Sequence, residues 1–372
     1  MITDEEKICS IALTLVPGIG HIGAKRLVDK MKGATDVFRL RKELPELVPG
    51  TRQRTVEALE SSQVFTRAQQ EYDYVLKNNI SCLTYWDDRY PSRLRECEDA
   101  PIVLYYRGNA DLNQLHVVNL VGTRHATEYG TQICATFIRD LKEICPDVLV
   151  VSGLAYGIDI HAHRESLANG VATVAVLAHG LDRIYPYLHR DTAQQMLENG
   201  GLLTEYMTGT APDRQNFVSR NRIVAGMCDA TIVVESAQKG GSLITADIAG
   251  SYHRDCFAFP GRISDEYSKG CNQLIRDNKA SVLLSAEDLV KALSWDSQLS
   301  AKKRENVQRC LFVELTEEQQ AVVDVLKRMG NLQINALTVE TNIPIHKMTG
   351  LLFELEMKGV VRALAGGVYQ LL

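Results

Sequence analysis

Three short segments of this chain combine glycine with hydroxyl or basic side chains, and each directly follows an apolar run. They are Gly122-Thr123-Arg124, Ser152-Gly153 and Lys239-Gly240-Gly241-Ser242. Glycine lets a backbone approach a ligand closely, and hydroxyl groups and helix-terminal N–H groups donate hydrogen bonds to anions. Arg124 adds a guanidinium whose forked donors match a phosphate. These residue types predict that the three segments bind phosphate groups.

A fourth segment of interest is Arg220-Asn221-Arg222, which stands just before an apolar helix. Two guanidinium groups and an amide suit a run of phosphates better than they suit a single buried carboxylate. The alternative is that both arginines form ion pairs that hold the domain together. The residue types leave both hypotheses open.

Other kinds of site find little support. The three glycine segments contain neither G-x-G-x-x-G nor G-x-x-x-x-G-K-[ST], which argues against dinucleotide and P-loop sites there. His161 and His163 are two residues apart, so a helix does not bring them to one face for a metal. The nine cysteines include no C-x-x-C pair. We therefore predict no catalytic residue, no metal and no cofactor.

An enzymatic alternative depends on acidic residues near predicted strand ends, which are Asp159, Asp182, Glu205 and Glu235. A nuclease would hold Mg²⁺ with paired carboxylates, and separate positions in the sequence do not establish such a pair. We therefore expect these carboxylates to accept hydrogen bonds from N–H groups of the loops. Glu235 could serve a nucleoside monophosphate hydrolase, but such enzymes resemble Pro-Gly-Gly-x-Gly-Thr at this loop, and this chain has Gln238-Lys239-Gly240-Gly241-Ser242-Leu243. A nucleotide sensor is a further alternative.

The elements that must position these loops are short apolar strands alternating with helix-length segments. The strands are expected at residues 117–121, 148–151, 173–177, 202–205, 231–235, 256–259 and 281–284. Continuous apolar strands between helices predict a parallel sheet covered on both faces. The carboxyl ends of such strands share one edge, so the loops can converge there. We predict an α/β fold, an extended Rossmann-like doubly wound sheet, over residues 79–298.

Two smaller domains are expected on either side. Residues 1–78 read as short helices, and the stretch from Leu15 to Gly20 followed by Lys25 and Arg26 looks like a helix-hairpin-helix, which either contacts DNA or serves packing. Residues 299–315 are predicted to be a linker. Residues 316–372 predict three helices and a hairpin, a winged helix whose first helix starts with Thr316 and Gln319 as a capping box. Its net charge of -1 favours contact with protein over duplex DNA.

Composition limits how the chain could meet a nucleic acid. Its formal net charge is -5, so any nucleic-acid site must be a local patch. No apolar run approaches the roughly 18 residues of a membrane span, and the first ten residues do not resemble a signal peptide. We expect a soluble, reduced, cytoplasmic protein that does not meet a membrane.

The motifs occur in an order and at spacings that resemble the DNA-processing protein A family (DprA, also called Smf). The resemblance covers residues 80–290 most strongly and includes Ala162-His163-Arg164, residues 241–246 and Phe259-Pro260-Gly261. It implies a Rossmann-like protein that binds single-stranded DNA cooperatively, usually as a homodimer, and loads the recombinase RecA during natural transformation. The family's phosphate-binding pattern falls on Arg124, Ser152, Gly153, Arg220, Asn221, Arg222, Gly241 and Ser242.

Two positions depart from the family pattern. Thr123 stands where serine is usual and keeps the hydroxyl. Tyr187 follows Tyr185-Pro186 where a DNA-contacting lysine is common. A tyrosine there could stack on a base, which is worth roughly 1–3 kcal/mol, but it supplies no charge. Lys239, Arg183 and Arg190 are the candidates to replace the lysine. The resulting hypothesis is a non-enzymatic mediator that binds single-stranded DNA.

Overall fold

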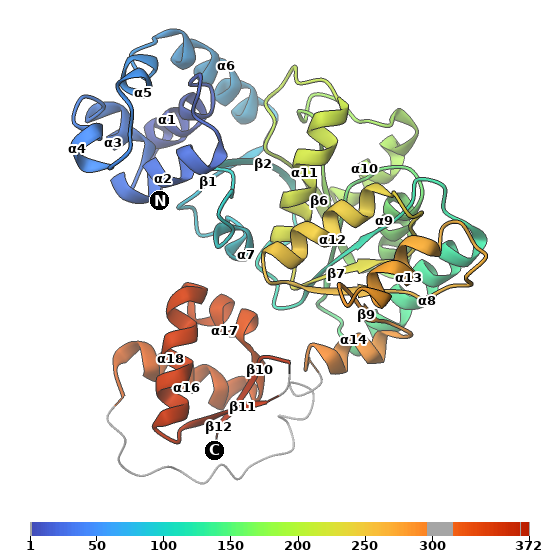
Figure 1. Cartoon of the computed structure of the whole chain (residues 1–372). Coiled ribbons are helices and arrows are strands. Elements are labelled where there is room, and N and C mark those ends of the chain that lie inside the picture. The colour runs from blue at the N-terminus through green and yellow to red at the C-terminus, as the bar shows by residue number, and fades with distance from the viewer. Residues whose placement is uncertain (1, 296–314, 365, 372) are drawn as a thin grey trace.

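The computed structural model describes residues 2–295, 315–364 and 366–371. Helices form the amino-terminal part, a large sheet with helices on both faces forms the middle, and a small helical domain with a hairpin ends the chain (Figure 1). The predicted linker lies outside the described residues except for Leu315. The domain boundaries stay predictions. Among the helices described, none is both long and apolar enough to cross a membrane.

The amino-terminal helices pack around one apolar core. They are α1 Asp4–Thr14, α2 His21–Met31, α3 Ala34–Arg39, α4 Leu44–Leu47, α5 Gln53–Ala58 and α6 Gln63–Lys77. Lys25 donates a hydrogen bond to Asp29 at 2.9 Å, and Arg26 donates one to the carbonyl of Pro49. Both basic side chains of the predicted hairpin therefore have partners within their own domain, which favours the packing interpretation. Gly18, Gly20 and Gly23 show the G-x-G-x-x-G spacing, but Gly18 and Gly20 lie between α1 and α2 and Gly23 lies within α2, so the motif does not follow a strand.

The described residues form a nine-stranded sheet in the order β1-β2-β6-β5-β4-β3-β7-β8-β9. Strands β3 to β9 run parallel to one another, and β1 and β2 add an antiparallel edge next to β6. Their bounds are β1 Ser81–Thr84, β2 Val103–Gly108, β3 Val117–Val121, β4 Leu149–Ser152, β5 Ala172–Val176, β6 Gly200–Thr204, β7 Ala230–Val233, β8 Asp255–Ala258 and β9 Ser281–Val282. The predicted α/β class and doubly wound sheet are confirmed.

Alternate residues of the central strands face opposite cores, as the pleat of a strand requires. In β3, Val117 and Val121 lie in the core under α11, α12 and α13, whereas Val118 and Leu120 lie in the core under α8, α9 and α14. The helices are α7 Ser92–Arg95, α8 Glu128–Ile144, α9 Ile158–Ala168, η1 Tyr187–His189, α10 Arg190–Met196, α11 Arg214–Gly226, α12 Gly241–Ser251, α13 Lys269–Arg276 and α14 Ala286–Ala292. Burial on both faces explains why the central strands are apolar at most positions.

The carboxyl-terminal domain is a winged helix, as predicted. It contains α16 Glu317–Met329, β10 Leu332–Gln333, α17 Ile334–Thr341, α18 Ile345–Met357, β11 Val361–Leu364 and β12 Val368–Leu371. The capping box at Thr316 and Gln319 is present. The domain attaches beside the amino end of β8. Arg254 donates to the Asn335 side chain at 2.9 Å, and Gln333 donates to Asp255 at 2.9 Å.

Candidate nucleic-acid interface

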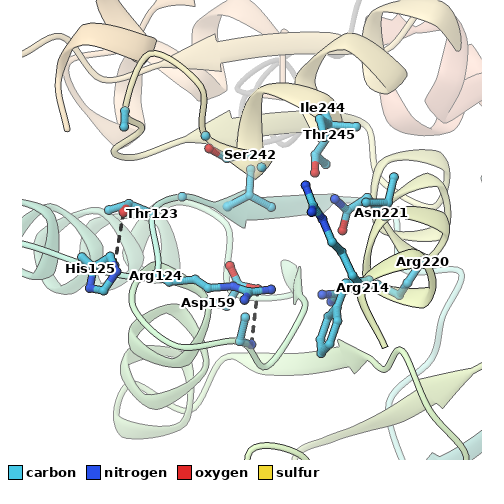
Figure 2. A pocket seen from close by; sticks show the side chains of 18 of the residues that line it. Thr123, Arg124, His125, Asp159, Arg214, Arg220, Asn221, Ser242, Ile244 and Thr245 are labelled. Atoms are coloured by element: carbon cyan, nitrogen blue, oxygen red, sulfur yellow. Dashed lines mark hydrogen bonds between the residues drawn. The ribbon is translucent and has the colours of Figure 1, made fainter. Parts of the chain in front are cut away.

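A cavity of about 790 Å³ opens where the chain connections leave the sheet in opposite directions. Strands β3 and β7 are neighbours, but β3 leads into α8 on one face and β7 leads into α12 on the other. In open α/β sheets this divergence leaves a crevice outside the carboxyl ends of the strands, where ligands bind. Two predicted segments line the cavity, at residues 122–124 and 239–242, and they are joined by Arg220 and Asn221 (Figure 2).

Positive charge prevails in this cavity although the whole chain is acidic. Its lining contains four cationic side chains against two carboxylates, an excess of two positive charges: Arg124, Arg214, Arg220 and Lys239 against Asp159 and Asp213. Asp213 is also committed locally, because its side chain caps α11 by accepting from the Asn216 N–H at 2.8 Å. A concave site with excess cations attracts anions more strongly than the net charge of -5 would suggest.

Backbone hydrogen bonds to two other segments hold the loop that carries Arg124. Thr123 N–H donates to the carbonyl of Glu235 at 2.8 Å, and the Thr123 carbonyl accepts from the N–H of Ile158 at 3.1 Å. The Arg124 side chain is exposed, and its guanidinium carbon lies 5.2 Å from the centre of the Phe217 ring. Cation–π contact therefore holds an exposed cation over the cavity.

Arg220 lies at the inner wall, almost completely buried. Its Nη1 donates to the Val176 carbonyl at 2.7 Å. Burial lowers the pKa of Arg220, and the nearby Asp159 carboxylate opposes that shift. Burial likewise raises the pKa of Asp159, with Arg220 opposing. A Cβ on Gly153 would lie 2.5 Å from Nη2 of Arg220, so this glycine provides room for the guanidinium.

The first turn of α12 forms the opposite wall. Gly240 is its N-cap residue, and the Ser242 hydroxyl donates to Ser236 at 2.9 Å. The first N–H groups of a helix have no partner within the helix and carry its positive dipole end. Lys239, just before this turn, is exposed. The segment thus has backbone donors and an exposed cation at the cavity, and its binding of phosphate stays a prediction.

One face of α11 completes the cavity. Arg214, Phe217, Val218 and Asn221 all line it, and they are spaced at i, i+3, i+4 and i+7. Such residues share one side of a helix. Arg214 is a lining residue that the sequence motifs do not identify, although its spacing of seven residues from Asn221 is a signal that places both on one side of the helix. Tyr185, Tyr267 and Thr245 lie in the same lining, and the motifs do not identify them as site residues either.

Arg222 does not reach the cavity. Its guanidinium forms a buried ion pair with Glu205 and donates to the carbonyl of Asp99 at 2.7 Å. It lines a separate pocket on another side of α11. The ion-pair interpretation therefore describes Arg222, and the expectation that both arginines supply charge to one groove is corrected.

Ser152 and Gly153 are also not part of the lining. The Ser152 hydroxyl is buried and donates to the Leu120 carbonyl at 2.6 Å, which links β4 to β3. Gly153 provides room for the guanidinium of Arg220. Ser152 was expected to donate to a phosphate, but its hydroxyl hydrogen is already bonded to the Leu120 carbonyl within the sheet, so its role here is structural.

Tyr187 lies outside the cavity, in the short helix η1. Its side chain is 71% exposed and borders a second pocket of about 410 Å³ with Arg107, Arg183 and Arg190. Arg190 donates to the Tyr187 hydroxyl at 3.3 Å. Two of the three candidates to replace the family lysine thus lie beside Tyr187, and the third, Lys239, lies in the main cavity.

The acidic residues considered for catalysis have structural partners. Glu235 is buried and accepts hydrogen bonds from the N–H and the hydroxyl of Thr127, at 2.9 and 2.5 Å. Asp182 pairs with Arg183, and Glu205 pairs with Arg222. In the described part of the chain, no three His, Cys, Asp or Glu side chains gather as metal ligands would. Glu235 is not in the cavity lining, so it does not face a ligand bound there.

Comparison with known proteins gives consistent matches. The family described as DNA recombination-mediator protein A matches residues 81–294, and the DprA winged helix domain matches residues 313–367. The chain is 40% identical over 204 residues to DNA processing protein DprA of Streptococcus pneumoniae, covering 55% of this chain and 71% of that protein. It is 34% identical over 294 residues to protein Smf of Synechocystis, covering 78% and 73%.

Two solved structures are also similar. DNA processing protein A from Streptococcus pneumoniae has a TM-score of 0.61 at 31% identity, covering 78% of this chain and 98% of that one. DNA processing protein A from Helicobacter pylori, described for its single-stranded DNA binding mode, has a TM-score of 0.52 at 29% identity, covering 58% and 96%. By these matches the chain belongs to the DNA recombination-mediator protein A (DprA) family.

Proposed function

We propose that this protein binds single-stranded DNA in the cavity between β3 and β7 and loads the recombinase RecA on that strand, without itself being an enzyme. The observation that carries the proposal is the excess of positive charge in a concave site of an acidic chain. The Helicobacter pylori relative, described for its single-stranded DNA binding mode, supports the choice of ligand. Natural transformation and recombination in the cytoplasm are the setting that the family suggests.

The cations serve as phosphate contacts in this proposal. Arg124 and Lys239 are exposed and Arg214 lies on the cavity-facing side of α11, so a strand reaches them without a change in the fold. Arg220 acts from the wall, and the first turn of α12 adds backbone donors. Each phosphate of a single strand that the protein neutralises contributes about -0.7 to the slope of log K against log salt concentration. Four such contacts therefore give a slope of about -2.8.

The test is fluorescence anisotropy with a labelled single strand and with a duplex of equal length, over a series of salt concentrations. Arg124→Ala and Lys239→Ala should each weaken binding and make the slope shallower by about 0.7. Arg139→Ala is the matched control, because Arg139 is an exposed arginine of α8 that pairs with Asp140 outside the cavity. Equal binding by Arg124→Ala, Lys239→Ala and wild type would refute the assignment of the cavity.

Experiments with a mononucleotide separate this function from its rivals. Displacement of the strand by a single mononucleotide at equal affinity, or turnover of that nucleotide, would favour a sensor or an enzyme. The recombinase step is tested by RecA filament assembly on the strand, which wild type should accelerate and Arg124→Ala should not. The same proposal includes a homodimer, which sedimentation of the full chain tests directly.

A further inference from the structure

The segment between β6 and α11, residues 205–213, leads into the cavity wall without belonging to a helix or a strand. Its last two residues, Pro212 and Asp213, line the cavity, and Arg214 follows them as the first residue of α11. Such a segment has no ladder or helix bonds of its own, so its backbone groups need partners elsewhere in the fold. The partners of this segment therefore determine where Arg214 lies.

Helix α6 of the amino-terminal domain supplies such partners at Thr208. Glu71 accepts hydrogen bonds from the Thr208 N–H at 2.9 Å and from the Thr208 hydroxyl at 2.5 Å. Arg67, one turn earlier on α6, donates to the Thr208 carbonyl at 2.7 Å and pairs with Glu71 at 2.8 Å. The N–H, the carbonyl and the hydroxyl of Thr208 are thus all bonded to one helix of another domain.

Burial makes the contact at Thr208 a strong constraint. Glu71 is only 2% exposed, and a buried carboxylate is costly when its partners are removed. Glu71 therefore favours the conformation in which Thr208 stays bonded to it. The amino-terminal domain also contacts the start of the segment, where Nδ1 of His21 in α2 lies 3.5 Å from the Glu205 carboxylate.

Two further hydrogen bonds connect the segment around Thr208 to the start of α11. The Tyr206 hydroxyl donates to the carbonyl of Asn216 at 3.3 Å, and the Asn216 side chain donates to the carbonyl of Ala211 at 3.2 Å. Asn216 lies in the first turn of α11, two residues after Arg214. The residues on both sides of Thr208 are therefore bonded to the turn that carries Arg214.

We propose that Glu71 and Arg67 are positioning residues of the cavity: they hold Thr208, and through it the first turn of α11, so that Arg214 reaches a phosphate of the bound strand. This inference rests on the proposed function. It gives the amino-terminal domain a part in strand binding although none of residues 2–78 lines the cavity. The Arg214 side chain is exposed, so its position depends on the backbone that carries it rather than on side-chain packing.

The experiment measures the salt dependence of single-strand binding by Glu71→Gln and Thr208→Val, which keep the side-chain shape but remove the charge or the hydroxyl. Between 50 and 200 mM salt, wild type with four phosphate contacts should lose affinity about 50-fold. Each variant, with Arg214 displaced and about three contacts left, should lose only about 20-fold. Thr208→Ser keeps the hydroxyl and should behave like wild type.

Two comparisons separate positioning from general damage to the fold. Tyr72→Phe is the matched control, because Tyr72 follows Glu71 on α6 but its hydroxyl donates to Asp4 within the amino-terminal domain, at 2.5 Å. It should keep the wild-type salt dependence. If Glu71 acts through Arg214, adding Glu71→Gln to Arg214→Ala should weaken binding no further. A loosened fold would instead weaken binding by the same factor in both backgrounds, which would overturn the proposal.

Thr208→Val changes a half-buried loop residue, so it should fold even if Glu71→Gln does not. If wild type binds the strand with the expected salt slope and Thr208→Val has the same slope and affinity, positioning through Thr208 is refuted and the proposed function stands. If wild type does not bind the strand, both fail.

Discussion

Gly157 fixes the position of the loop that carries Arg124. It stands directly before α9 with φ 75° and ψ -128°, a backbone conformation that residues other than glycine rarely adopt. A Cβ at this position would meet the carbonyl oxygen of Thr123 and would lie 2.6 Å from the carbonyl carbon and 2.7 Å from the Cα of Arg124. Gly157→Ala must therefore strain its own backbone and push the loop outward.

The cost of this substitution has two parts. A residue held at an unfavourable positive φ costs about 1–3 kcal/mol, and forcing extra atoms into a packed site costs about 1–3 kcal/mol. We expect Gly157→Ala to lower the free energy of unfolding by about 2–6 kcal/mol in total. Gly170→Ala, just past the other end of α9, is the control. Gly170 has φ 63° and no atom within 4 Å of an added Cβ, so its cost is only about 1–2 kcal/mol.

Urea unfolding measures the two free energies, and anisotropy with a single strand measures the effect on the site under conditions where both variants are folded. Gly157→Ala should lose affinity because Arg124 moves, whereas Gly170→Ala should bind like wild type. Equal stability losses in the two variants, or unchanged affinity in folded Gly157→Ala, would show that the loop tolerates the added atom and would refute the reasoning.

Three other perturbations follow from buried polar groups. Arg222→Ala should lower the melting temperature, because the buried Glu205 carboxylate loses its arginine partner, but it should leave the salt slope of strand binding unchanged; a shallower slope would mean that Arg222 does contribute to the cavity. Asp229→Ala leaves buried Arg93 without its carboxylate and should cost about 3–5 kcal/mol in denaturant unfolding, whereas a loss below 1 kcal/mol would mean that the pair is not truly desolvated. Burial lowers the pKa of His163 to about 3, so the folded state resists its protonation, and this contribution to stability is complete above pH 6.5 and is lost as pH falls toward 3. Below pH 6.5 the loss is about 1.4 kcal/mol per pH unit, and His163→Gln should show a shallower dependence in unfolding experiments at several pH values.

The sheet and the convergence of its loops could be predicted from the sequence. Apolar strands alternating with helices imply parallel pairing, and parallel pairing brings the segments after β3 and β7 to one edge. The prediction for residues 122–124 and 239–242 follows from that topology, and both segments do line one cavity.

Arg220 and Arg222 of α11 show why the sequence alone could not predict the whole cavity lining. Arg220 and Arg222 are two residues apart, so their directions differ by about 200° around the helix, at 3.6 residues per turn. Both cannot face one cavity, and periodicity alone does not say which one does. The choice depends on Glu205, which precedes Arg222 by 17 residues and meets it only in the folded sheet. Glu71 and Thr208 likewise come together only through tertiary structure.

Helix α12 connects the cavity to the attachment of the winged helix. Its first turn, at Gly241 and Ser242, borders the cavity, and three residues past its last residue Arg254 donates both to Asn335 and to the carbonyl of Arg93 at 2.9 Å. Eleven residues of helix span about 16 Å. Helix α12 is thus a short, continuous path from the cavity to the residues that attach the winged helix.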